Sequence, residues 1–66
     1  MTVKQLIKVL LTVEANVQEF VVIDEARKEH FVKDLVGLDP YANKEVLSFS
    51  KIPNTVGQFE IMLARH

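Results

Sequence analysis

Apolar residues recur at steps of three and four along the start of the chain, which predicts a helix from residue 2 to about residue 14. Thr2 directly precedes these apolar residues. Gln5 comes three residues after Thr2, which is the spacing of a capping box. Asn16 is the expected exit residue. The face that would be buried consists of Val3, Leu6, Ile7, Leu10 and Val13.

A short run of β-branched and aromatic residues, Phe20 to Ile23, predicts the first strand. Glu19 and Asp24 bound this run. Neighbouring strand residues point to opposite sides, so both faces of this strand are apolar. The pattern therefore predicts a central strand, or one that is covered on both faces.

Residues 24–38 admit two interpretations. In the first, residues 24–28 turn and residues 30–38 return as the second strand of a hairpin. In the second, Asp24 caps a helix over residues 25–36 that ends at Gly37. The strand interpretation divides the apolar residues between two faces, with Phe31 and Leu35 on one and Val32, Val36 and Leu38 on the other.

The remainder of the chain predicts a turn over residues 39–44, a strand over 45–50, a loop over 51–57 and a strand over 58–65. In the first of these strands, alternation places Leu47 and Phe49 on one face and Ser48 and Ser50 on the other. In the last strand Phe59, Ile61 and Leu63 face inward, and Met62 is apolar on the outer side.

These elements predict a single α+β domain over residues 1–66. One N-terminal helix packs on a three- to four-stranded, mostly antiparallel sheet, and the alternative adds a second helix over residues 25–36. The expected core joins the helix residues Val3, Leu6, Ile7 and Leu10 to Leu47, Phe49, Phe59, Ile61 and Leu63. A chain of 66 residues without cysteine has a marginal core and no disulfide, so tight packing or oligomerisation must support it.

A single helix covers only one face of such a sheet. The other face would then expose Val21 or Val22, Met62, and one of the two apolar sets of residues 30–38. Exposed apolar patches mark protein–protein contacts, and a symmetric homodimer is the leading form for so small a domain. Val21, Met62 and Tyr41, an aromatic residue in the predicted turn, are therefore the candidate partner contacts.

The charges are nearly balanced, with eight Lys and Arg against nine Asp and Glu and a formal net charge of −1. Dedicated nucleic-acid binders carry a basic surplus, so this balance argues against that class. Lys4 and Lys8, one helical turn apart, are the candidate phosphate contacts if nucleic acid is bound. The acid-rich segment 19–39 could instead meet a basic partner.

The sequence predicts no catalytic, cofactor-binding or metal-binding residue, and we expect no enzyme activity. Gly37 and Gly57 belong to no phosphate-binding loop, and Ser48 and Ser50 lie on the expected outer face of a strand. His30 would share a helix face with Asp34 only in the helical interpretation, and no second histidine is near it in sequence. We see no targeting signal and no membrane-spanning run, so we expect a cytoplasmic protein without a membrane partner.

Three segments, Met1 to Leu10, Phe20 to Ile23 and Val46 to Ser48, resemble short uncharacterised phage and prophage proteins that open M-T-V-K-x-L-I. The chain departs from that pattern after Ser50, and it carries Glu14-Ala15-Asn16 where many of these proteins have Pro-Pro-Asp. The resemblance favours the hairpin over residues 24–38. It implies no catalytic residue and points to a small accessory or regulatory protein that acts by binding. A phage-type inhibitor or modulator of a host protein would fit the size and the mild acidity of the chain.

The expected function is therefore protein–protein interaction as a homodimer. The alternatives are a nucleic-acid-associated regulatory protein and, less favoured, a small metal-binding protein or enzyme.

Overall fold

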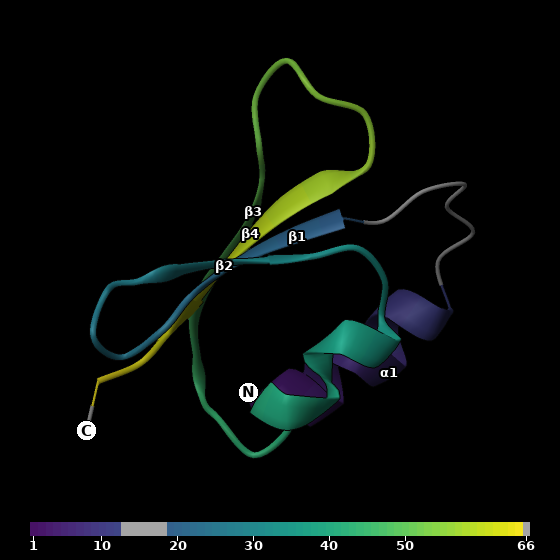
Figure 1. The fold of residues 1–66 in the computed structure, drawn as a ribbon. Helices are drawn as coiled ribbons and strands as arrows, with labels where there is room; N and C mark the ends of the chain where they lie inside the picture. The colour runs from purple at the N-terminus through teal and green to yellow at the C-terminus, as the bar shows by residue number, and fades with distance from the viewer. Residues whose placement is uncertain (13–18, 66) are drawn as a thin grey trace.

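The computed structural model describes residues 1–12 and 19–65, and it consists of one α-helix, one 3₁₀ helix and four strands (Figure 1). In chain order these are α1 (Val3–Leu11), β1 (Glu19–Ile23), β2 (Glu29–Val32), the 3₁₀ helix η1 (Val36–Tyr41), β3 (Val46–Lys51) and β4 (Gln58–Leu63).

Helix α1 begins with the predicted capping box. The Thr2 hydroxyl accepts a hydrogen bond from the Gln5 N–H at 3.3 Å, and Oε1 of Gln5 accepts one from the Thr2 N–H at 2.8 Å. These two bonds satisfy backbone donors that the first helical turn leaves free. The helix ends at Leu11 rather than near residue 14, and the predicted stripe residue Val13 and exit residue Asn16 lie outside the described residues.

The four strands form one mixed sheet in the order β2-β1-β4-β3. Two antiparallel pairs, β1–β2 and β3–β4, are joined by a parallel pair, β1–β4. The α+β fold with a mostly antiparallel sheet is thus confirmed. Strand β1 has a neighbour on both sides, as its two apolar faces predicted.

Residues 24–32 form a hairpin, so the alternative helix over residues 25–36 is wrong. The Asp24 carboxylate accepts hydrogen bonds from the backbone N–H groups of Ala26, at 2.8 Å, and Lys28, at 2.9 Å. An Asp side chain that binds backbone groups two and four residues later closes a turn in competition with a helix. Arg27 completes the turn with a φ of 65°, a left-handed conformation that ends any helical path.

The returning strand stops at Val32 instead of continuing to Leu38, which corrects the other part of the hairpin prediction. Residues 36–41 form η1, with Pro40 inside it. Gly37 brings η1 close to β2, because a Cβ atom at this position would lie 2.5 Å from Cγ1 of Val32. Leu35 and Leu38 therefore pack against the core at the start of this second, short helix, whereas Val36 is 73% exposed.

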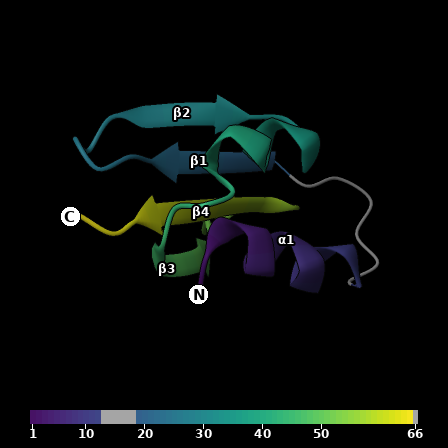
Figure 2. The ribbon, with the colours of Figure 1, turned by 90° about the horizontal axis from the view of Figure 1, so that it is seen from below.

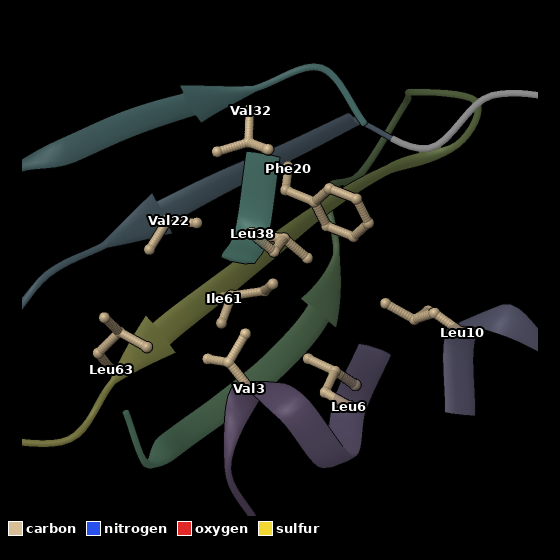
Figure 3. Packing of buried hydrophobic residues seen from close by; sticks show 9 residues of the cluster. All are labelled: Val3, Leu6, Leu10, Phe20, Val22, Val32, Leu38, Ile61 and Leu63. Carbon is tan, nitrogen blue, oxygen red and sulfur yellow. The ribbon is translucent and has the colours of Figure 1, made fainter. Parts of the chain in front are cut away.

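Both helices cover the same face of the sheet (Figure 2). Helix η1 lies over the β1–β2 side and α1 over the β3–β4 side. Leu38 from η1 is fully buried near the middle of the sheet, above Val22 and Ile61 (Figure 3). The core lies between the sheet and the helices and consists of Val3, Leu6, Leu10, Phe20, Val22, Val32, Leu38, Ile61 and Leu63.

Strand β3 contains a register shift between Val46 and Ser48, and this shift corrects the expected position of Leu47. Val46 lies opposite Leu63, whereas Ser48 lies opposite Met62, so Leu47 is an extra residue in the ladder. Leu47 is 58% exposed instead of buried. Phe49 keeps its predicted inward position and stacks on Phe59, with ring centroids 5.2 Å apart.

Candidate functional site

The second face of the sheet has no helix over it in the described part of the chain (Figure 2). Four apolar residues of the described strands β1, β2 and β4 share this open face. The ladder places Val21 beside Phe31 and Ile23 beside Met62. Phe31 is 79% exposed, and the other three are partly buried. We call this set, Val21, Ile23, Phe31 and Met62, the apolar patch.

A groove of about 310 Å³ adjoins the apolar patch. Val21 from β1 and Phe31 from β2 line it, together with Ile52 from the turn after β3. Its polar lining residues include Glu19 and Lys33. A groove of this size accepts one or two side chains of a partner, which is how anchor residues contribute to binding.

The charged residues around the apolar patch are mainly acidic. Glu60 lies beside Val21, Glu29 lies beside Ile23, and Glu19 lies on the same face two residues before Val21. Lys33 is the basic residue at the groove. The open face therefore combines apolar area with acidic charge, and a complementary surface would combine apolar residues with Lys or Arg.

The structure brings two of the predicted partner contacts, Val21 and Met62, onto one face, and places the third elsewhere. Tyr41 ends η1 on the opposite, covered face, where it is half-buried against the core. Its ring lies 6.0 Å from the His30 ring. Val22, the alternative to Val21, is fully buried in the core.

The candidate phosphate contacts Lys4 and Lys8 are both exposed on α1. They are one turn apart on the same side of the helix, as the spacing predicted. Because α1 lies over the covered face of the sheet (Figure 2), these lysines lie on the other side of the sheet from the apolar patch.

A cluster of polar side chains closes the β1–β2 end of the sheet. Oδ2 of Asp24 lies 2.7 Å from Nε2 of His30. This hydrogen bond, with those from the backbone N–H groups of Lys28 and Ala26, lowers the pKa of the Asp24 carboxyl. The Arg27 guanidinium donates to the backbone oxygen of Leu63 at 3.2 Å, and Nζ of Lys44 lies 2.6 Å from Oε1 of Glu25. These contacts fasten the hairpin turn to neighbouring elements.

Among residues 1–12 and 19–65, no three His, Asp or Glu side chains come together as a set that could hold a metal ion. His30 and Asp34 do not share a helix face, because His30 belongs to a strand. Ser48 and Ser50 are exposed on the open face, opposite Met62 and Glu60. In the same described residues, no helix has both the length and the apolar character to cross a membrane.

Phe31, the most exposed residue of the apolar patch, was not among the predicted partner contacts. The sequence left open whether Phe31 or Val32 faces outward, because the hairpin register was unknown. The turn settles this question: Asp24 pairs with Lys28, so Val21 lies opposite Phe31 and Phe20 opposite Val32. An Asp at the start of a five-residue turn was the available signal.

Comparisons of the chain with protein-family models, with curated proteins and with solved structures found no match.

Proposed function

We propose that this chain is a small accessory protein that binds another protein through the open face of its sheet, without enzyme activity. The observation that carries the proposal is the apolar patch, in which Phe31 on the edge strand β2 is 79% exposed. An exposed aromatic side chain on a strand, beside partly buried apolar residues, is typical of an interface anchor.

The charges around the apolar patch define the chemistry of the partner. Glu19, Glu29 and Glu60 favour a surface that carries Lys or Arg around an apolar centre. A cytoplasmic host protein that meets a phage-type modulator is the partner class we propose, in line with the resemblance of residues 1–10, 20–23 and 46–48. We also propose that the chain acts as a homodimer.

The test is capture of partners from host lysate on immobilised protein, with and without Phe31→Ser. Val36→Ser is the matched control, because Val36 is 73% exposed on η1, away from the open face. We expect a protein that binds the wild type and Val36→Ser but not Phe31→Ser. Equal capture by all three proteins would contradict the use of the open face.

The alternative function is nucleic-acid-associated regulation through Lys4 and Lys8, which are exposed one helical turn apart on α1. Retention on heparin that falls with rising salt, and that Lys4→Gln with Lys8→Gln removes, would favour this alternative. The proposal made above predicts no such retention. It also predicts that no metal ion or metabolite raises the temperature of unfolding.

A further inference from the structure

The sheet has two edges, and they differ in how far they are protected. At the β3 edge, the Val46 N–H donates to the Met1 oxygen at 2.8 Å, and Thr2 forms a bridge with Glu45. The bulge at Leu47 distorts the same edge. At the β2 edge, no strand of the described residues lies beyond β2 (Figure 2). Strand β2 is therefore the less protected of the two edges.

The backbone groups available at the β2 edge follow from the hairpin. The Asp24 N–H donates to the Lys28 oxygen at 2.9 Å, and hydrogen-bonded pairs alternate along an antiparallel ladder. The next such pairs are Val22–His30 and Phe20–Val32. The N–H and C=O groups of the residues between them, Glu29 and Phe31, therefore point away from β1, and Lys33 directly follows the strand.

Residues at equal distances before and after Phe31 carry opposite charges. Two residues before Phe31 is Glu29 and two residues after it is Lys33. A segment with this pattern is complementary to a second copy of itself that runs in the opposite direction.

We propose that a second copy of this chain pairs antiparallel with β2, with Phe31 opposite Phe31 of the second copy. The inference rests on the proposed function, since it identifies the surface through which the homodimer forms. In this register Glu29 lies opposite Lys33 of the second copy, the residue that directly follows its β2. Phe31 lies opposite Phe31 of the second copy, and because the backbone groups of this residue point outward, the pair forms two hydrogen bonds.

Other registers that preserve the backbone hydrogen bonds lose this complementarity. A shift by two residues in one direction places Glu29 opposite Phe31 and Arg27 opposite Lys33, which are like charges. The opposite shift places Lys33 opposite Phe31 and Glu29 opposite Leu35. The register centred on Phe31 alone among these three pairs Glu29 with Lys33.

The geometry also favours edge pairing over stacking of two open faces. Face-to-face stacking would place Glu60, Glu29 and Glu19 of both copies, six carboxylates, within one interface. Edge pairing about a two-fold axis keeps both open faces on the same side of one continuous sheet, four strands from each copy. The two apolar patches then adjoin, and both remain accessible to the partner that we propose.

The experiment is a charge exchange, with the association measured by sedimentation equilibrium over a wide range of protein concentration. Glu29→Lys and Lys33→Glu each create like-charge pairs at both ends of the dimer ladder. We expect each single variant to raise the dimer dissociation constant about tenfold or more. The double variant E29K/K33E restores opposite charges and should recover the wild-type constant.

A mixture of the two single variants gives a second, independent readout. In a mixed dimer each altered residue faces an opposite charge, so E29K and K33E together should associate about as well as the wild type. Glu29 and Lys33 are exposed, and thermal unfolding at low concentration should show that each variant folds. A dimer that all variants form equally would overturn this pairing and leave the proposed function intact.

A wild-type chain that remains monomeric at every concentration would also overturn the pairing. It would overturn the proposed homodimer as well. Binding of a partner through the open face is then still decided by capture from lysate, because that test compares Phe31→Ser with Val36→Ser and does not depend on self-association.

Discussion

Nε2 of His30 lies 2.7 Å from Oδ2 of Asp24, at the end of the sheet where β1 turns into β2. The same carboxylate accepts two backbone hydrogen bonds through Oδ1. One side chain thus closes the turn and fixes the neighbouring strand, on which the position of Phe31 depends.

Acid should weaken the fold through Asp24. Its hydrogen bonds lower the pKa of the carboxyl below the ordinary value of 3.8, so the folded state favours the charged form. The stability that this gives is complete above pH 3.8 and is lost as the pH falls through the lower, folded-state pKa. In Asp24→Asn the unfolding temperature should depend less on pH in this acidic window, while being lower at neutral pH. Equal pH dependence of variant and wild type, followed by circular dichroism, would contradict this role.

Leu38 should be among the most sensitive positions of the core. It is fully buried beneath η1, and Leu38→Ala should reduce the free energy of unfolding by about 2–5 kcal/mol. A domain of this length has a total stability of only about 3–10 kcal/mol, so the variant should be partly unfolded at room temperature. Val36→Ala, in the same helix and 73% exposed, should change stability by less than about 0.5 kcal/mol. Urea unfolding measures the free energy of unfolding of both variants. Similar losses in the two variants would contradict the burial of Leu38 and the exposure of Val36.

Gly37 should tolerate no Cβ atom unless β2 gives way. In Gly37→Ala the new atom would meet Cγ1 of Val32 at 2.5 Å, and we expect a loss of about 1–3 kcal/mol. Val32→Ala removes that Cγ1 atom, so the double variant should lose less than the sum of the two single losses. Additive losses in a double-mutant cycle would show that the contact with Val32 is not the cause.

The bulge in β3 predicts opposite behaviour for two neighbouring apolar residues. Leu47 is 58% exposed, and Leu47→Ala should change the free energy of unfolding by less than about 0.5 kcal/mol. Phe49 stacks on Phe59 and contacts the core, so Phe49→Ala should cost about 1–3 kcal/mol. Thermal or chemical unfolding measures both losses of stability. A large loss in Leu47→Ala would contradict the bulge, because Leu47 would then be buried as regular alternation along β3 requires.

The sequence was sufficient for the elements whose signals are local. The cap at Thr2, the apolar run Phe20 to Ile23 and the alternation of Phe59, Ile61 and Leu63 each describe one segment, and each was confirmed. The bulge was not predicted because Leu47 to Ser50 alternate regularly between apolar and polar residues. The one additional residue changes which face Val46 and Leu47 occupy, and the alternation in the sequence does not show this change. Helix η1 escaped because a short apolar run fits a strand and a helix equally well.

The open face was predicted only in part, because its composition depends on pairing between distant segments. Val21 and Met62 were expected there from alternation within their own strands. Phe31 joins them through the register of the hairpin, and Ile23 meets Met62 through the parallel pairing of β1 and β4. No local pattern specifies which strands become neighbours, so the sequence alone gave no full outline of this surface.

The parallel pair β1–β4 has a consequence for how the chain folds. The hairpins β1–β2 and β3–β4 are each closed by local turns, whereas β1 and β4 must meet across most of the chain. Closing a long loop is slow compared with closing a hairpin, so the docking of the two hairpins should limit the folding rate. During synthesis the first hairpin emerges from the ribosome without its central neighbour, and β1 stays available to other strands until β4 follows.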